Sequence, residues 1–351
     1  MALTTVAAAN TEELWDAEFF KSYVRENRFK RFMGQTENSI IQVRNNLTKQ
    51  AGDGITIPLV TELTGAGQTG NGLLEGNEEA LGNYGDKIEV ATIRHAVAVT
   101  DNDQQFTGIP LREAGRVQLQ AWAKAKLRND IITALGTVSA SGTKYTYAAA
   151  TAGQRNTWLA ANSDRIMFGD GSVGAYAVLA TDLAAVTASM KLTKEVVSKA
   201  KARAETASPK IRPVTVGEDS ETFVMFVDAR AFRDLKVDLS TSLQNAQERG
   251  DNNPLWRDGD LMWDGVVIRK IQEIASLGTV GASSAAVSPY YLCGAQSLGV
   301  AWAQITKSTT DTRDYGFIKG VGIHEMRGVE KLVYNNKDHG VFTGFVGAAA
   351  L

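Results

Sequence analysis

Cysteine and histidine are scarce in this chain of 351 residues, and their scarcity excludes several classes of functional site. A single cysteine, Cys293, leaves no basis for a disulfide framework or a cysteine-rich metal cluster. The three histidines, His95, His324 and His339, are too widely spaced for a metal-binding motif. No glycine-rich segment carries the lysine of a phosphate-binding loop. We therefore expect no metal and no cofactor.

The chain also lacks a strong net charge and a long hydrophobic run. Its formal net charge is −2, so it has no overall basic field of the kind found in proteins that read nucleic acid. No apolar stretch approaches the roughly 20 residues that span a bilayer, and we expect no membrane partner. Hydrophobic residues make up 44% and charged residues 22%, which is typical of a folded protein. The predicted elements show no regular βαβ alternation, which indicates an α+β fold.

The stretch from residue 54 to residue 136 contains the most unusual pattern. Alternating apolar residues predict one strand over residues 55–63 and a second over residues 87–100. Between them, residues 64–86 include seven glycines and show no periodicity. Loops of this length are rare in a compact domain, and hairpins normally close within a few residues. We therefore predict a long hairpin that projects from the body and packs on another copy of the chain.

The second predicted strand changes face partway along. Ile88 and Val90 share one face of an extended strand, whereas Ile93, Val97 and Val99 share the other. A strand exchanges its faces only at a bulge, bend or twist. We place this point at residues 91–92, so that the first half projects onto a neighbour and the second half joins the subunit's own sheet.

A helix of about 25 residues is predicted between Pro110, which is tolerated in a first turn, and Gly136, a natural stop. At 1.5 Å per residue it is roughly 37 Å long, enough for a spine across the subunit. Residues at helical spacing form one apolar face. They are Leu111, Ala114, Val117, Ala121, Ala125, Ile132 and Leu135.

Residues 1–53 are predicted to form an arm. It contains an aromatic stripe that includes Trp15 and Phe19, followed by a short basic cluster. The cluster comprises Lys21, Arg25, Arg28, Lys30 and Arg31. It could contact nucleic acid or dock on a neighbouring copy. We favour docking, because the cluster is short and the rest of the chain is not basic.

Two short motifs are typical of enzymes. Residues 65–70 match G-x-G-x-x-G, but the residues that follow do not open a helix, so we interpret them as a flexible tip. Residues 295–299 are close to a nucleophile elbow around Ser297, and Asp311 or Asp314 and then His324 or His339 follow in α/β-hydrolase order. Alanine replaces the first glycine of that motif and no parallel sheet is predicted. A hydrolase that uses Ser297 therefore remains an alternative hypothesis only.

The order of these features resembles the tailed-phage major capsid proteins of the Hong Kong 97 type, and within them a podophage-like group. The motifs that carry the resemblance are short and are spread over most of the chain. They lie at residues 54–59, 73–76, 212–213, 223–228, 232–236, 265–268, 294–299, 314–317 and 328–331.

The resemblance implies an α+β capsid fold and an architecture for the whole chain. The expected parts are an N-terminal arm (1–53), an extended hairpin loop (54–100), a peripheral domain with the spine helix (101–180), an axial domain (181–305) and C-terminal strands of the peripheral domain (306–351). It also implies a non-enzymatic shell of hexamers and pentamers around double-stranded DNA. The protein would assemble in the host cytoplasm and reside in the virion, with separate scaffold, portal and decoration proteins. A cellular nanocompartment shell of the same fold is the alternative.

The predicted contacts between subunits come from the arm and the hairpin. The hairpin tip carries acidic residues and no lysine or arginine between residues 64 and 85, so we expect it to lie near the basic arm of another subunit. The arm residues are Trp15, Phe19, Arg25, Arg28, Lys30 and Arg31. The hairpin residues are Leu73, Leu74, Glu75, Glu78, Glu79, Leu81 and Tyr84.

Overall fold

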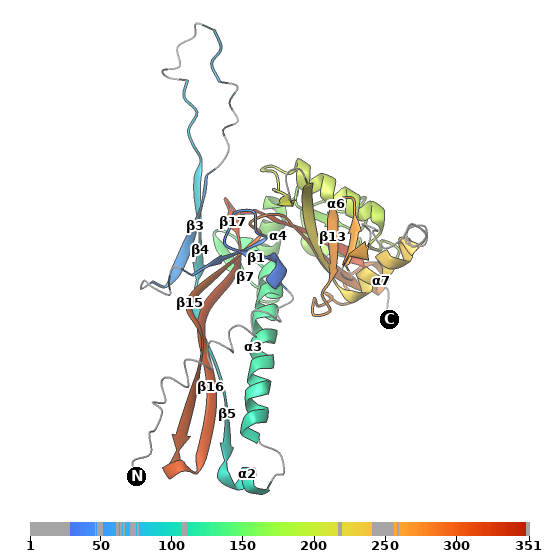
Figure 1. Ribbon diagram of the computed structural model, residues 1–351. Coiled ribbons are helices and arrows are strands. Elements are labelled where there is room, and N and C mark those ends of the chain that lie inside the picture. Colours follow the sequence, from blue (N-terminus) through green and yellow to red (C-terminus); the bar gives the residue numbers. More distant parts are fainter. Residues whose placement is uncertain are drawn as a thin grey trace.

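The computed structural model describes residues 29–45, 47, 52–60, 63, 65, 67–70, 75, 77–106, 111–216, 220–240, 256–257 and 260–348. Figure 1 shows three parts: a hairpin that rises above the molecule, a spine of strands and one long helix below it, and a compact domain to one side. The mixture of helices and strands confirms the predicted α+β class.

A five-stranded sheet forms the spine, in the order β1–β2–β15–β16–β5. Its strands span Met33–Gly34 (β1), Ile41–Arg44 (β2), Leu298–Arg313 (β15), Ile318–Lys331 (β16) and Ala91–Thr100 (β5). β15, β16 and β5 pair antiparallel, whereas β2 joins β15 in parallel. The β15–β16 ladder shifts register twice, between Trp302 and Gln304 and between Gln304 and Lys307. Each shift is an extra residue in β15, as in a β-bulge.

β15 was not predicted from the sequence, although it is 16 residues long. Its first five residues, from Leu298 to Trp302, are all buried, so they show no alternation. The register shifts then interrupt the period-two pattern, and the final residues, from Thr309 to Arg313, are all exposed. β16, its antiparallel partner, is one continuous strand of 14 residues.

Helix α3 spans Leu111–Leu135, which confirms the predicted length and both ends. The predicted apolar face is wrong, because Ala114, Val117 and Ala121 are exposed. The buried face runs instead through Gly115, Leu119, Ala123, Leu127, Ile131, Ala134 and Leu135. Leucine and isoleucine remove more apolar surface from water than alanine does, so this face gains more free energy from packing on the sheet.

The turn from β5 into the short helix α2 (Asp101–Phe106) is capped locally. The Thr100 hydroxyl donates to a carboxylate oxygen of Asp103 at 2.7 Å and accepts from the Asp103 N–H at 3.2 Å. Asp101 and Asp103 therefore lie in the first turn of a helix.

The compact domain is built on a larger mixed sheet, in the order β11–β12–β13–β10–β14–β19–β8, with β9 paired to β10. Its strands are β8 (Ile166–Phe168), β9 (Val214–Val216), β10 (Ser220–Val227), β11 (Trp256–Arg257), β12 (Asp260–Trp263), β13 (Val266–Lys270), β14 (Val287–Cys293) and β19 (Val341–Gly347). Helices α6 (Lys194–Thr206) and α7 (Ala229–Asp238) pack on it, and both begin at side-chain caps, Thr193 and Asp228.

Further short elements complete the body of the subunit. They are the short 3₁₀ turns η1 (Lys30–Phe32), η3 (Ala282–Ser284) and η4 (Asp314–Gly316), helices α4 (Ala152–Ala161) and α5 (Leu179–Ala184), and two small ribbons, β6–β7 (Val138–Ala140, Thr143–Tyr145) and β17–β18 (Val333–Tyr334, Lys337–Asp338). Among the described residues, no helix combines the length and hydrophobicity needed to cross a bilayer.

The boundaries of the parts differ from those predicted. β19, at the C-terminal end, returns to the sheet of the compact domain rather than to the spine, and β15 begins at Leu298, before the predicted boundary at residue 305. Residues 29–45 belong to the body rather than to an arm, because Phe29, Ile40 and Ile41 are buried in its core. These connections join segments that are far apart in sequence, so local patterns do not reveal them.

Candidate assembly surfaces

The base of the hairpin is part of its own subunit. β3 (Gly54–Val60) and β4 (Asn83–Glu89) pair antiparallel over seven residues. Ile57 and Ile88 are buried against Ala301, Leu332 and Tyr334. The predicted neighbour-bound segment, residues 64–86, is therefore too long, since the strand pair already includes residues 83–86.

The two halves of the second hairpin strand are separated by one residue, Val90. The lower half, β5, joins the subunit's own sheet by pairing with β16. The predicted change of face is confirmed and lies one residue before the predicted site. The chain therefore leaves the hairpin and enters the spine at a single bend.

A polar clamp holds β4 against the body. Lys144 Nζ lies 2.8 Å from a carboxylate oxygen of Asp86 and 2.7 Å from one of Glu330. The same Asp86 oxygen accepts from the Val333 N–H at 2.9 Å, and Glu330 accepts from the Glu89 N–H at 3.1 Å. All three charged side chains are largely buried, so the clamp fixes the angle at which the hairpin leaves the body.

Two glycines allow this close approach. A Cβ on Gly328 would lie 2.0 Å from the Glu89 carbonyl oxygen, and one on Gly299 would lie 2.2 Å from Ile88 Cδ1. Neither position has room for a side chain. The resemblance motifs included both glycines, and their role is to let the hairpin base lie directly on β15 and β16.

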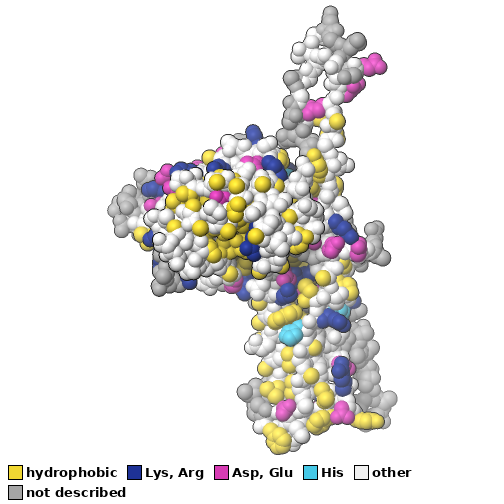
Figure 2. All heavy atoms as spheres, turned by 180° about the vertical axis from the view of Figure 1, so that it is seen from behind, with side chains coloured by type: hydrophobic (Ala, Val, Ile, Leu, Met, Phe, Trp, Pro, Cys, Tyr) yellow, Lys and Arg dark blue, Asp and Glu magenta, His cyan; other side chains and the backbone are white. Residues whose placement is uncertain are grey.

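The projecting part of the hairpin exposes apolar side chains. Val60, Leu63, Leu81 and Tyr84 are exposed by 56%, 61%, 59% and 39%, and Figure 2 shows how far this segment stands from the rest of the molecule. The predicted contact residues Glu75, Glu78 and Glu79 are also exposed, and Glu79 accepts from the Gly65 N–H at 2.7 Å. The predicted Leu73 and Leu74 lie outside the described residues.

Two of the predicted arm residues are described. Lys30 and Arg31 are exposed within η1. Phe29 and Phe32, beside them, pack edge-on against Phe226 in the body, with ring centroids 5.1 and 5.5 Å away. Trp15, Phe19, Arg25 and Arg28 lie outside the described residues.

The lower end of the spine is a second exposed apolar surface, which the sequence analysis missed. Phe106 is 86% exposed at the end of α2, and Tyr315 is fully exposed in the turn between β15 and β16. The Phe317 carbonyl accepts from the Asp101 N–H at 2.9 Å, which places this turn beside α2. Asp314 and Tyr315 both have positive φ, a conformation that costs non-glycine residues energy.

The spine is stiffened by ion pairs between α3 and β16. The buried Arg327 guanidinium lies 2.8 Å from Glu325 and 2.7 Å from Asp130 of α3. Glu325 also accepts from the Thr306 hydroxyl at 2.7 Å. A buried arginine with two carboxylate partners joins helix and sheet in one geometry.

A second buried network lies where the spine meets the compact domain. Lys331 Nζ is 2.7 Å from Asp338 and donates to the Thr137 carbonyl at 2.6 Å. The Trp158 indole also donates to Asp338, at 3.1 Å, and the Arg165 guanidinium donates to the backbone carbonyls of residues 338, 339 and 209. This junction connects segments of both sheets.

The arrangement around Ser297 contradicts the hydrolase alternative. Its hydroxyl is fully buried and donates to the carbonyls of Gly294 and Gly340, at 2.8 and 2.6 Å. The candidate base His324 lies beside Gln304 instead, 3.3 Å away. The motif is therefore a tight turn, which Gln296 enters with a positive φ. Among the described residues, no three histidine, cysteine or carboxylate side chains gather as metal ligands would.

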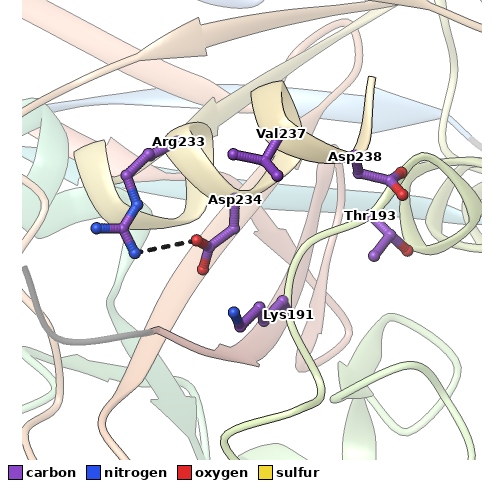
Figure 3. Close-up of a pocket in the computed structure, with 6 residues that line it drawn as sticks. All are labelled: Lys191, Thr193, Arg233, Asp234, Val237 and Asp238. Carbon is purple, nitrogen blue, oxygen red and sulfur yellow. Dashed lines mark hydrogen bonds and ion pairs between the residues drawn. The ribbon is translucent and has the colours of Figure 1, made fainter. Parts of the chain in front are cut away.

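A surface pocket of about 460 Å³ lies between α7 and the start of α6. It is lined by Lys191, Thr193, Arg233, Asp234, Val237 and Asp238 (Figure 3). Arg233 lies 3.2 Å from Asp234, Asp238 accepts from the Lys194 N–H at 2.8 Å, and Thr193 caps α6. The hydrogen bond between Lys194 and Asp238 joins the two helices. The lining contains no nucleophile paired with a histidine.

Comparison with known proteins agrees with this geometry. The chain has 38% sequence identity and a TM-score of 0.86 to the solved cyanophage Pam1 capsid asymmetric unit, over 100% of both chains. It is 27% identical to the major capsid protein of Pseudomonas phage KPP25, over 95% of this chain and 94% of that protein. The capsid of Ralstonia phage GP4 has the same fold, with a TM-score of 0.74 at 22% identity over 92% of each chain. The family model described as "Phage capsid protein" matches residues 4–346, and the chain therefore belongs to the phage capsid protein family.

Proposed function

We propose that this chain is the major subunit of an icosahedral phage shell, built of hexamers and pentamers, that encloses double-stranded DNA. The hairpin is the observation that carries the proposal. Its base is clamped in the body, while its outer part stands away and exposes apolar side chains. Exposed apolar surface of this kind marks a contact with another molecule. Family membership supports another copy of the chain as that molecule.

The hairpin stabilises the shell through many small contributions. Burying a valine, leucine or aromatic side chain completely contributes about 1.5–3 kcal/mol. Because Val60, Leu63, Leu81 and Tyr84 are already partly covered, about 1 kcal/mol remains for each, or roughly 4 kcal/mol for one hairpin. Repetition over all copies makes the closed shell stable while the contact of one pair stays weak.

The hairpin tip and the segment around Lys30 carry opposite charges. Glu75, Glu78 and Glu79 make the tip acidic, and Lys30 and Arg31 continue the basic cluster of the preceding residues. We infer a salt-sensitive attraction between the tip of one subunit and the basic segment of another. A shell structure in which these groups are separated by more than two Debye lengths, about 16–20 Å, would contradict this inference.

The remaining partners follow from the same role. The protein makes non-specific contacts with packaged DNA, and separate scaffold, portal and decoration proteins complete the particle, which assembles in the host cytoplasm. The shell subunit has no catalytic role, and the buried, backbone-bound Ser297 supports that view.

Particle contents distinguish a phage shell from a nanocompartment: nuclease-protected DNA supports the first, and enclosed enzyme supports the second.

Electron microscopy of the purified protein tests the proposal. The wild type should form closed shells. Leu81→Asp should prevent assembly and leave a folded subunit, because it places a charge in the apolar contact. The matched control is Asn83→Asp, which adds the same charge two residues away without removing apolar surface and should reduce assembly less. A wild type that stays monomeric under all assembly conditions would refute the proposal.

A further inference from the structure

The outer edge of β5 is open. β5 is the last strand of the spine sheet and pairs with β16 over ten consecutive residues without a register shift. In the part of the chain that the structure describes, no strand pairs with its other edge. Alternate residues of an edge strand direct their backbone N–H and C=O groups away from the sheet. An edge of this length is a template for pairing with another chain.

β5 lacks the features that natural proteins use to block such an edge. It contains neither proline nor lysine, and Arg94 is its one charged residue. Six of its ten residues are exposed, namely Ala91, Thr92, Arg94, His95, Ala96 and Ala98. On the opposite side, the edge among the described residues is formed by β1, which is 2 residues long, and by the part of β15 beyond Ala301, because β2 pairs with β15 only at residues 298–301. That part of β15 contains both register shifts, whereas β5 offers ten residues without one.

We propose that β5 pairs antiparallel with β5 of a second copy, across a two-fold axis beside Ala96. The inference rests on the proposed function, since it requires copies that meet in a shell. The result is one continuous sheet that joins the spines of two subunits through backbone hydrogen bonds. This contact is separate from the proposed contact of the hairpin.

The residues that face each other select the register. A centre at Arg94 would place two guanidinium groups in direct opposition, which destabilises a strand pair. A centre at His95 would crowd two rings, because His95 already packs against Trp122, with ring centroids 4.6 Å apart and the ring planes tilted by 42°. A centre at Ala96 sets two methyl groups opposite each other and Arg94 opposite Ala98. The other opposed pairs are then Thr92–Thr100, Ile93–Val99 and His95–Val97, combinations that suit a sheet.

Helix α3 is compatible with this arrangement. A two-fold axis perpendicular to the sheet keeps both copies of α3 on the same face. α3 packs on β5, since the Trp122 ring packs against His95 and a Cβ on Gly115 would lie 3.2 Å from Val97. If α3 is centred over the β5–β16 pair, its copy lies about 10 Å away, because strands are about 4.8 Å apart. That is a normal distance between packed helices.

The side of α3 that would face its copy suits close packing. Residues three or four positions from Gly115 and Trp122 lie next to them around the helix. Gln118, three positions from Gly115 and four from Trp122, is exposed beside both, and Ala114 and Ala121, four and three positions from Gln118, continue the same exposed stripe. Two alanines in the stripe allow the helix backbones to approach. The exposed side of α3 that contains Ala114 and Ala121 would therefore be buried between the two helices in the assembled shell.

Cysteine cross-linking in assembled shells tests the register. Directly opposed residues of an antiparallel pair have Cβ atoms about 4.5–5.5 Å apart, so Ala96→Cys should form disulfide-linked dimers under mild oxidation. The control is Ala98→Cys, on the same face of β5 and also exposed. Its own copy lies four residues out of register, about 13 Å away, and it should remain monomeric. The native Cys293 is fully buried and does not interfere.

Two further measurements complete the test. The double variant Arg94→Cys/Ala98→Cys should restore cross-linked dimers, because these positions face each other. A reconstruction of the wild-type shell should show β5 beside its own copy. Any of three outcomes would overturn the inference. They are equal cross-linking at positions 96 and 98, no cross-linking in intact shells, and density for a hairpin or another segment on this edge. A wild type without shells would remove the proposed function as well, whereas shells without the Ala96 cross-link would remove this inference alone.

Discussion

Replacing Lys144 with methionine should release the hairpin base from the body. The Asp86 and Glu330 oxygens lie 2.8 and 2.7 Å from the same Nζ, so they are no more than 5.5 Å apart. Without the cation, two largely buried carboxylates repel each other. Coulomb's law at an effective dielectric constant of about 20 gives about 3 kcal/mol for this repulsion. Methionine retains most of the aliphatic volume, so the change isolates the charge.

Hydrogen exchange measures this effect locally. The N–H groups of Glu89 and Val333 donate directly to Glu330 and Asp86, so their exchange reports on the clamp. A loss of about 3 kcal/mol in the local opening free energy corresponds to an exchange rate about 150-fold faster at these two amides. Exchange in α6, which lies in the compact domain, should not change.

Two variants control this prediction. Lys126→Met also removes a lysine from an ion pair, but its partner Asp130 keeps Arg327 at 2.7 Å, and the lysine is 40% exposed. This variant should lower the local opening free energy by less than about 0.5 kcal/mol. Lys144→Met combined with Glu330→Gln removes one of the two carboxylates and should recover most of the lost protection. If Lys144→Met behaves like Lys126→Met, the clamp does not hold the hairpin and the reasoning is refuted.

Three other predictions concern the body. Burial lowers the pKa of His339 to about 4 from its usual 6.5, so unfolding takes up a proton at any pH between these two values. The free energy of unfolding should therefore fall by up to about 3 kcal/mol as the pH drops from 6.5 to 4. His339→Gln should flatten this pH dependence of the free energy of unfolding, measured by urea denaturation. Gly328→Ala should detach the hairpin base and lower the melting temperature, whereas Gly320→Ala on the same strand, where the nearest atom lies 3.7 Å from the new Cβ, should be tolerated. Lys331→Met should cost about 3–5 kcal/mol in the free energy of unfolding, because it leaves Asp338 buried without its cation, and an effect below 1 kcal/mol would mean that water replaces the lysine.

Features set by neighbouring residues were predictable from the sequence. Pro110 and Gly136 bound α3, and Thr193 and Asp228 cap α6 and α7, because helix ends depend on backbone groups within one turn. The long glycine-rich segment and the change of face beside Val90 depend equally on local pattern. These signals were sufficient to identify the hairpin and the spine helix.

Features set by distant partners were not predictable. Lys144 is 58 residues from Asp86 and 186 from Glu330, so no spacing rule connects the clamp. α3 offers two apolar faces, and only the sheet beneath it selects the one with Leu119 and Leu127. The exposed Tyr315 lies in a turn motif that the resemblance included, but exposure depends on what the rest of the chain leaves uncovered.

The two register shifts in β15 together determine which face of the sheet each side chain of its distal half occupies. Because side chains alternate between the faces of a strand, one extra residue would turn the whole distal half of β15 over. The second shift restores the phase, so that Thr306 and Ser308 face inward as Val300 and Trp302 do. Deleting one residue between Trp302 and Lys307 should therefore damage the lower spine more than deleting two. Whether the number of residues in this segment is odd or even therefore matters more for the lower spine than how many residues it has.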